Sequence, residues 1–280
     1  MARGGGLLSG PMDIAPGIRD AVNLDRYPIF DIDGDKARKL ISEMQTQLAA
    51  TGVCIAEDFV RPDALERLAA EADDLASLAH LSDVTGTPYI EPPRTDFTTG
   101  HPRRCLVHTR LRAVAYDLFP RDSVLRWLYE SDDLMGFLAK VLKKSPLYRY
   151  ADPLGGLNLA VMTDGDELGW HYDQTDFVVS LAIQSSEQGG DFESARRIRS
   201  ADDEHYDEVA RVLAGESHPL VETVPMRAGT LMLFEGRFSL HRVSPIRGPR
   251  PRYVGLLAYD TKPGTTSSEL LRGIRYGRAS

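Results

Sequence analysis

The second half of the chain consists of short apolar runs separated by glycine, proline and charged residues. The runs at residues 157–162, 177–183, 229–234 and 252–259 are rich in valine, leucine and aromatic residues. Apolar runs of this length between turn residues are typical of buried strands. A domain built from many short strands is usually an antiparallel sandwich or barrel. We therefore expect a mainly β core with helical additions.

The first half of the chain shows helical periodicity instead. Apolar residues recur at helical spacing over residues 35–50, 62–81 and 121–144, and the apolar run at residues 53–56, between the first two of these segments, predicts a short strand. This spacing gives each helix one apolar stripe, which has to pack against another element. We expect helices that cover one face of the β core.

The length of 280 residues suits one domain with a substantial core. Residues 1–25 are glycine-rich with scattered prolines, which predicts a flexible N-terminal segment. Residues 26–280 are predicted to form a single domain, with a helical region over residues 26–145 before a barrel core over about residues 146–262.

Two histidines and an aspartate have the spacing of metal ligands. His171 and Asp173 are one residue apart, and on a strand such residues point to the same face. His241 follows the predicted strand at residues 229–234 after a turn. Two histidines and one carboxylate form the facial triad that binds non-haem Fe(II) and leaves positions open on the metal. We predict that these three residues bind iron.

A second His-x-Asp sequence occurs at His205-Tyr206-Asp207. It follows acidic residues that are typical of a helix start. On a helix, positions i and i+2 lie about 200° apart around the axis. These two side chains would not bind one ion, and we predict no metal site there.

Five motifs follow one another through the core region. They are His171-Tyr172-Asp173, Gly189-Gly190-Asp191-Phe192, Gly229-Thr230-Leu231, His241-Arg242-Val243 and Arg252-Tyr253. This order resembles that of the Fe(II)- and 2-oxoglutarate-dependent oxygenases over about residues 157–260. The resemblance implies a double-stranded β-helix, a cupin-like jelly roll, with helices packed on one face.

The resemblance also implies Fe(II), 2-oxoglutarate and O2 as reactants, with ascorbate supporting turnover in vitro. 2-Oxoglutarate keeps a carboxylate free at its far end, and a guanidinium binds a carboxylate through two parallel hydrogen bonds. Arg252 has the family's spacing from His241, and we predict that it binds this carboxylate. Arg250 is the alternative, although the prolines on both sides of it favour a loop. Asn158 would point into the barrel, where it either contacts 2-oxoglutarate or has a structural role.

The segment at residues 86–104 is rich in proline, threonine and charge. A loop of this length inside a compact domain is often functional. His101, Arg103 and Arg104 either bind a substrate carboxylate or are ordinary solvated charges. Arg237, in the turn before His241, either reaches the site or belongs to the turn alone. We name these four residues as predicted substrate contacts.

Residues 165–171, 189–193 and the insert at 198–207 resemble a bacterial subgroup of these oxygenases that acts on free amino acids. The subgroup includes hydroxylases and radical halogenases. Its halogenases replace the carboxylate ligand with Gly or Ala, which opens a site for chloride, whereas this chain has Asp173. We expect hydroxylation of an unactivated C–H bond in a small metabolite, a free amino acid or a derivative, with release of succinate and CO2.

Two other functions are compatible with the same motifs. Desaturation or cyclisation of a natural-product intermediate would use the same residues. A non-catalytic jelly-roll binding protein could keep the metal site, but the intact anchor at Arg252 argues against it.

Composition excludes several classes of protein. The net charge of −8 and the pI of about 5.4 argue against a nucleic-acid-binding surface. Cys54 and Cys105 are too few for a disulfide framework, and their apolar neighbours predict buried thiols. The sequence has neither an apolar stretch long enough to span a membrane nor the pattern of a signal peptide. We expect a cytoplasmic enzyme with a small-molecule substrate and no nucleic-acid or membrane partner. Its oligomeric state has no signal in the sequence.

Overall fold

The computed structural model describes residues 17–280. Most of the segment predicted to be flexible, residues 1–16, lies outside the described residues. The remainder of that segment is folded, because Ile18–Ala21 form helix α1, and Ala21 and Val22 are fully buried. The expectation of a flexible segment therefore does not hold for residues 17–25.

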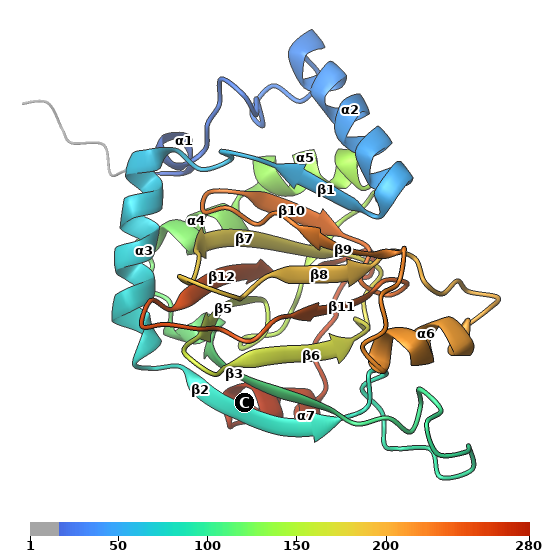
Figure 1. The fold of residues 1–280 in the computed structure, drawn as a ribbon. Coiled ribbons are helices and arrows are strands. Elements are labelled where there is room, and N and C mark those ends of the chain that lie inside the picture. Colours follow the sequence, from blue (N-terminus) through green and yellow to red (C-terminus); the bar gives the residue numbers. More distant parts are fainter. Residues whose placement is uncertain (1–16) are drawn as a thin grey trace, which may run out of the picture.

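A curved antiparallel sheet forms the centre of the molecule (Figure 1). Its eleven strands are β1 (Val53–Ala56), β2 (His80–Gly86), β3 (Val107–Ala115), β5 (Leu157–Met162), β6 (Glu167–His171), β7 (Val178–Gln184), β8 (Phe192–Ala195), β9 (Val221–Val224), β10 (Leu231–Phe234), β11 (Leu240–Val243) and β12 (Arg252–Leu257). A separate pair consists of β4 (Tyr148–Arg149) and β13 (Tyr259–Asp260). The order across the large sheet is β1-β10-β7-β12-β5-β3-β6-β11-β8-β9, and β2 pairs with β3.

Strand β3 connects the two halves of the sheet. Its residues 112–115 pair with β5, whereas residues 109 and 110 pair with β6. Twisted strands that change partners in this way bend a sheet into a barrel-like shape. The predicted mainly β, jelly-roll core is confirmed. It brings β6 and β11, which carry the two predicted histidine ligands, side by side.

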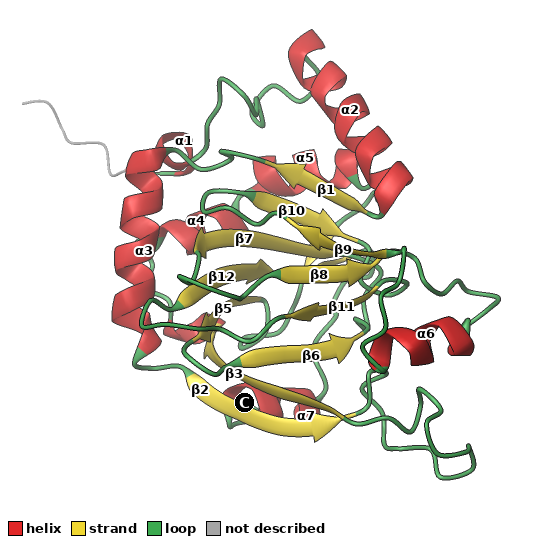
Figure 2. Cartoon of the chain, viewed as in Figure 1, coloured by secondary structure: helices red, strands yellow, loops and turns green. Residues whose placement is uncertain are grey.

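Most of the helices share one core with the sheet (Figure 2). Besides α1, the helices are α2 (Asp35–Thr51), α3 (Pro62–Ala76), α4 (Val124–Glu130), α5 (Asp132–Val141), α6 (Tyr206–Leu213) and α7 (Glu269–Tyr276), with a 3-10 turn at Tyr116–Leu118. Helices α1 to α5 pack with strands β5, β7, β10 and β12 in the largest hydrophobic cluster. Helix α6 packs in a second cluster with Trp170 and Leu240, and α7 lies against β2 and β3. The prediction of helices on one face thus holds for α1 to α5.

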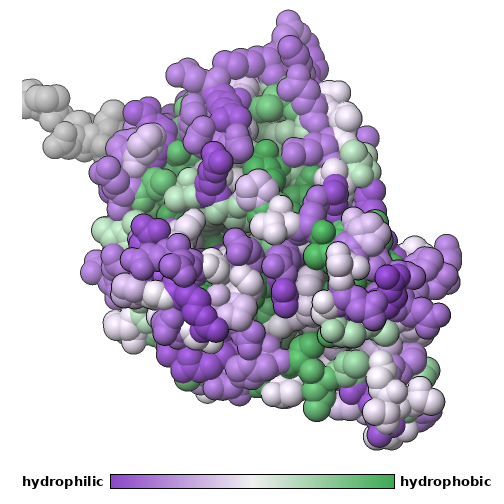
Figure 3. Space-filling model, in the orientation of Figure 1, coloured by the Kyte–Doolittle hydropathy of each residue, from purple (hydrophilic) through white to green (hydrophobic). Residues whose placement is uncertain are grey.

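The ends of the long helices follow from the sequence. Helix α2 stops at Gly52, which has a φ of +72° and donates its N–H to the carbonyl of Leu48 at 2.8 Å. Glycine adopts this left-handed conformation at little cost, which makes it the common residue just past a helix end. Figure 3 shows hydrophilic residues over the outer faces of α2 and α3, with hydrophobic residues visible between them. The apolar stripes of these helices face the sheet, as their periodicity predicts.

Two predicted helices were too long. The helix predicted over residues 62–81 ends at Ala76, and the chain then enters β2, whose register is set by pairing with the distant strand β3. The helix predicted over residues 121–144 is split at Ser131, which has an extended backbone and accepts a hydrogen bond from the N–H of Leu134. Long-range pairing and a local cap therefore override the helical pattern.

The predicted division of the domain also needs correction. Strands β2 and β3 belong to the large sheet although they come from residues 26–145, the region expected to be mainly helical. Strand β1 lies at residues 53–56, where a strand was predicted. None of the helices in residues 17–280 is long and apolar enough to cross a membrane.

Cys54 is buried, and burial raises the pKa of its thiol to about 12, whereas Cys105 is partly exposed. The prediction of a buried thiol is therefore confirmed for Cys54 only.

His108 provides a test of pH dependence, because it links three strands. On β3, its ring nitrogens lie 2.9 Å from the carboxylate of Asp83 on β2 and 2.9 Å from that of Glu167 on β6. These two carboxylates raise the pKa of His108 above the ordinary value of 6.5. The stabilisation is therefore fully present below about pH 6.5 and is lost as the pH rises through the raised pKa of the folded state.

We expect the Tm of the wild type to exceed that of His108→Gln by about 1–3 °C at pH 6 and to match it at pH 9. His205→Gln, which changes an exposed histidine outside this group of ion pairs, is the control in the same thermal scans. A difference between wild type and His108→Gln that does not depend on pH would contradict this account.

Candidate metal centre

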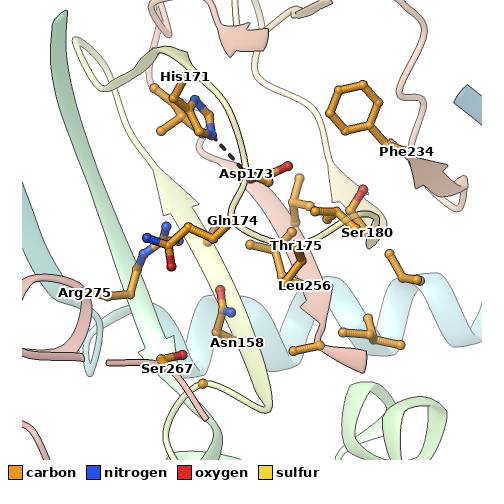
Figure 4. Close-up of a pocket in the computed structure, with 18 of the residues that line it drawn as sticks. Asn158, His171, Asp173, Gln174, Thr175, Ser180, Phe234, Leu256, Ser267 and Arg275 are labelled. Atoms are coloured by element: carbon orange, nitrogen blue, oxygen red, sulfur yellow. Dashed lines mark ion pairs between the residues drawn. The ribbon is translucent and has the colours of Figure 1, made fainter. Parts of the chain in front are cut away.

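The three predicted ligands converge at one place in the barrel. His171 ends β6 and pairs directly with His241 on β11. Nε2 of His171 lies 3.8 Å from Oδ1 of Asp173, and Nε2 of His241 lies 3.4 Å from Oδ2 of the same residue. One ligand atom from each residue lies within 4.8 Å of the others, and Figure 4 shows His171 and Asp173 facing one another. No other group of this kind occurs in residues 17–280, so the sequence His205-Tyr206-Asp207 forms no second site there.

The backbone orients both imidazole rings toward a metal. Nδ1 of His171 lies 2.8 Å from the carbonyl of Gly169, and Nδ1 of His241 lies 2.9 Å from the carbonyl of Ser239. A carbonyl only accepts, so each Nδ1 carries the proton and each Nε2 keeps its lone pair for a metal. Burial, together with the neighbouring imidazole of His241, lowers the pKa of His171 to about 4. This ring is therefore neutral at physiological pH, as a metal ligand must be.

Asp173 supplies the strongest sign that a cation belongs here. Its Oδ2 atom is buried and has no hydrogen-bond partner within residues 17–280. A buried carboxylate oxygen normally has a donor or a cation beside it. Two histidine nitrogens and one carboxylate are the ligand set of ferrous facial triads. The residues present therefore fit Fe(II).

The predicted alternation of side chains is correct, although the strand is shorter than expected. Strand β6 ends at His171, and Asp173 is held beyond it by a hydrogen bond of 3.1 Å from its N–H to the carbonyl of Gly236. Tyr172 points away from the ligands and packs under the guanidinium of Arg199, 3.7 Å from its ring centre. His171 and Asp173 consequently share the metal-facing side.

Only glycine at position 236 leaves room for the carboxylate of Asp173. A Cβ atom at position 236 would lie 1.7 Å from Oδ2 and 2.6 Å from Cγ of Asp173. We expect Gly236→Ala to displace the carboxylate and to weaken Fe(II) binding by at least about tenfold, since changes beside metal ligands commonly cost 10–100-fold. Metal titration of the purified variant measures this.

Gly86→Ala is the matched control for that titration, because a Cβ at position 86 meets nothing within 4 Å. Circular dichroism checks that both variants are folded. Unchanged Fe(II) affinity in a folded Gly236→Ala protein would contradict the assigned position of Asp173.

A cavity of about 310 Å³ opens beside the three ligands. This volume is at the lower end of the range for small-molecule sites. Besides the triad, the lining contains the amides of Asn158 and Gln174, the guanidinium groups of Arg252 and Arg275 and several hydroxyl-bearing residues, and apolar side chains form much of the remaining wall.

Arg252 is buried in this cavity without a carboxylate partner. The side chain is 8% exposed, and its only polar contact within residues 17–280 joins its NH1 group to the sulfur of Met162 at 3.9 Å. Burial lowers the pKa of Arg252 to about 10, so the guanidinium stays charged at neutral pH. The Gly-Gly turn passes close to this side chain, because Gly190 has a φ of +72° and a Cβ there would lie 3.0 Å from Cδ of Arg252. A buried, unpaired guanidinium is suited to bind an anion.

Asn158 and Arg250 differ in their access to the cavity. Asn158, on β5, is buried and lines it, and its Oδ1 atom has no hydrogen-bond partner within residues 17–280. Arg250 is absent from the lining and donates to the carbonyl of Ser186 at 3.2 Å. The cavity therefore favours Arg252 over Arg250 as the anchor.

The three charged loop residues predicted to contact substrate lie outside the cavity lining. Arg103 donates to Glu91 at 2.6 Å, to Glu204 at 3.0 Å and to the hydroxyl of Tyr206 at 2.8 Å. His101 stacks on Phe97, and Arg104 donates to the carbonyl of that same residue. These contacts tie the loop at residues 87–105 to the segment around α6, which lies beside it in Figure 1.

Arg237 also lies outside the cavity lining. It donates to Asp176 at 2.7 Å and to the carbonyl of Gln174. Both partners belong to the loop that follows Asp173, so Arg237 holds this loop next to the metal ligands.

The C-terminal part of the cavity wall was missed from the sequence. Ser267, Leu271, Arg275 and Tyr276 line the cavity from helix α7 and the turn before it. Ser268 accepts a hydrogen bond from the N–H of Leu271, and Gly277, with a φ of +71°, ends the helix. A serine cap and a glycine stop are recognisable helix signals, so this helix could have been predicted.

Comparisons with known proteins agree with this geometry. A model of the family described as Halogenase D matches residues 36–270. A search of curated proteins finds no match. Solved structures with a similar fold include an oxidoreductase of the 2OG-Fe(II) oxygenase family from Burkholderia pseudomallei, with 14% identity, a TM-score of 0.50, and coverage of 79% of this chain and 91% of that chain.

Two further structures share the fold. The non-haem, alpha-ketoglutarate-dependent carbocyclase SnoK from nogalamycin biosynthesis has 12% identity and a TM-score of 0.54, with 78% of this chain and 82% of that chain covered. HygX from Streptomyces hygroscopicus, solved with nickel, 2-oxoglutarate and hygromycin B bound, has 14% identity and a TM-score of 0.50, with 78% and 86% covered. At these identities the likeness concerns the fold alone.

Proposed function

The chain is an enzyme of the Halogenase D family with the fold of the 2-oxoglutarate- and Fe(II)-dependent oxygenases, and from this premise we propose that it hydroxylates an unactivated C–H bond of a small molecule. Asp173 is the observation that carries the proposal. A halide could bind the metal only if the ligand position beside the two histidines were vacant, and in this chain the carboxylate of Asp173 occupies that position. Succinate and CO2 are the co-products.

Each residue of the site has a task in this reaction. His171, Asp173 and His241 hold Fe(II), and the guanidinium of Arg252 binds the far carboxylate of 2-oxoglutarate. Bound iron and 2-oxoglutarate together supply the activation of O2. Asn158, with its unpaired Oδ1 in the cavity, is a second candidate contact for the co-substrate.

Aromatic side chains keep the histidine ligands in place and exclude water. The ring of Phe234 lies 4.7 Å from that of His241 in an edge-on arrangement, and the ring of Phe192 lies 5.6 Å from it. Both phenylalanines are buried and line the cavity. An apolar wall of this kind limits solvent access to a metal and to the reactive groups bound there.

A free amino acid or a derivative is the proposed substrate class, and the cytoplasm is the proposed location. The resemblance of residues 165–171 and 189–193 to the amino-acid-oxidising subgroup supports the first point. The modest cavity volume supports it as well, because 2-oxoglutarate already fills part of that space.

Cyclisation or desaturation is the second candidate outcome. The carbocyclase SnoK shares the fold of this chain, which keeps this outcome open within the same site. Hydroxylation adds one oxygen atom to the substrate, whereas desaturation and ring closure each remove two hydrogens. The product mass therefore distinguishes hydroxylation from the other two reactions.

The experiment is a turnover assay with purified protein, Fe(II), 2-oxoglutarate, ascorbate, chloride and a panel of amino acids. We expect succinate release to be stimulated by a panel member, and the product to gain one oxygen atom that derives from O2. A chlorinated product would reject the hydroxylase assignment. Succinate release no higher than that of the Asp173→Ala variant across the panel would reject the activity altogether.

A further inference from the structure

Helix α7 closes one side of the cavity and is firmly held there. The N–H of Ser267 donates to Asp152 at 2.8 Å, and the hydroxyl of Ser82 on β2 donates to the carbonyl of Ile274 at 2.5 Å. Tyr276 is buried against the barrel wall. The backbone of α7 is therefore fixed in position, which gives the side chains that it directs into the cavity a defined starting point, as substrate-contacting residues need.

Arg275 is such a side chain. It lies on α7 and lines the cavity, and Figure 4 shows it pointing into the pocket beside Gln174, with Asn158 and Ser267 nearby. Within residues 17–280 its guanidinium has no hydrogen bond and no ion pair. Arg278, just past the helix, contacts Asp117 at 2.6 Å. Arg272, the other arginine of α7, lies 4.0 Å from Asp152 and outside the cavity lining, although its Nε has no hydrogen-bond partner within residues 17–280. Arg275 is thus the α7 arginine with its donors free and directed at the cavity.

The charges inside the cavity indicate what Arg275 binds. Asp173 is the only acidic residue among the lining residues. With Fe(II) and 2-oxoglutarate bound, the positive charges in the cavity are those of the metal, Arg252 and Arg275. The negative charges are those of Asp173 and of the two co-substrate carboxylates. The sum is one unit of positive charge. A charge enclosed by protein is costly unless it is paired. One further anionic group, brought in by the substrate, would balance the site.

We propose that Arg275 is the specificity-determining residue of this enzyme and binds a carboxylate of the substrate. The proposal rests on the proposed function and names the substrate class as a small molecule with a free carboxylate. Gln174, which lies beside Arg275 in Figure 4, and Ser267, which lies below it in the same view, supply further hydrogen-bonding groups for the same carboxylate. The carboxylate would be held on the α7 side, which leaves the rest of the substrate to extend toward the metal ligands.

A binding experiment without turnover tests this role. Protein loaded with Ni(II) and 2-oxoglutarate is titrated calorimetrically with a panel of amino acids and small carboxylic acids, each paired with its primary carboxamide. We expect at least one acid to bind about tenfold or more tightly than its amide, because a charge-assisted pair between a carboxylate and a half-buried arginine contributes about this much. Acids that bind no better than their amides, or a panel without any binding acid, would overturn the proposal.

Variants separate Arg275 from other sources of charge. Arg275→Gln should abolish the preference for the acid, and Arg275→Lys should restore part of it, since lysine keeps the charge but not the planar fork. Arg278→Gln is the matched control, because Arg278 pairs with Asp117 on the surface. A preference that survives in Arg275→Gln, or that is lost equally in Arg278→Gln, contradicts the assignment.

The anion could also belong to the co-substrate, and a separate titration decides this. 2-Oxoglutarate binding to the Ni(II) protein should have the same Kd in Arg275→Gln as in the wild type. A Kd weakened about tenfold would assign Arg275 to 2-oxoglutarate instead. The proposed oxygenase activity is tested separately, by measuring the succinate that the iron-loaded wild type releases. Acid-selective binding without succinate would reject the oxygenase activity and leave the role of Arg275 standing.

Discussion

Asp173→Ala is expected to reduce substrate-stimulated succinate release by more than about 100-fold. Even changes to residues that only orient metal ligands lower metal affinity or activity 10–100-fold, and this change removes a ligand outright. In this variant the two remaining protein ligands are neutral histidines, so no protein carboxylate offsets the double charge of the metal in the buried site. Succinate release under saturating Fe(II), and the Fe(II) content of the protein after desalting, measure the two consequences.

The second His-x-Asp sequence provides the matched control for this experiment. Asp207 occupies the same place in its tripeptide as Asp173 and shares the preceding tyrosine, but it lies on helix α6 outside any metal-binding group in residues 17–280. Asp207→Ala should therefore keep both the iron and the activity. Equal losses in the two variants would show that the three-residue motif does not locate the metal.

The metal centre could be predicted from the sequence because it depends on short-range geometry. Residues one apart on an extended segment share a face whether or not the strand continues, so His171 and Asp173 converge even though β6 ends at His171. The spacing rule also placed Tyr172 on the opposite side, where it packs against Arg199. His241 was expected on a neighbouring strand, and it pairs directly with His171.

The substrate side of the cavity could not be predicted in the same way. Arg275 comes from a helix that follows the last strand, and only the packing of α7 against β2 and β3 brings it to the pocket. The helix predicted over residues 62–81 includes the first two residues of β2, His80 and Leu81, because the strand that pairs with β2 lies more than twenty residues further along the chain. The charged residue Arg103 looked equally suited to bind substrate, but Glu91 and Glu204 already pair with its guanidinium. Local sequence shows which charges exist, whereas the fold decides which of them remain unpaired.

Arg252→Met is expected to have opposite effects on co-substrate binding and on the stability of the protein without 2-oxoglutarate. Losing one partner of a buried, hydrogen-bonded charge pair costs about 2–5 kcal/mol, which corresponds to a Kd for 2-oxoglutarate raised about 30-fold or more. Methionine fills a similar volume without a charge, so the same variant should unfold at a higher temperature than the wild type when no 2-oxoglutarate is present. The lowered pKa of Arg252 already indicates that its charge is held against the cost of burial.

Calorimetric titration with 2-oxoglutarate and thermal unfolding with and without the co-substrate test both halves of this prediction. Arg250→Met is the matched control, since Arg250 has the same charge two residues earlier but lies outside the cavity lining. The wild type and the control should gain thermal stability from 2-oxoglutarate, and Arg252→Met should not. If Arg250→Met instead lost the affinity and Arg252→Met kept it, the anchor would be Arg250. A lower unfolding temperature for Arg252→Met without co-substrate would mean that the buried guanidinium stabilises the barrel. That result would contradict the view that its charge is unpaired until 2-oxoglutarate binds.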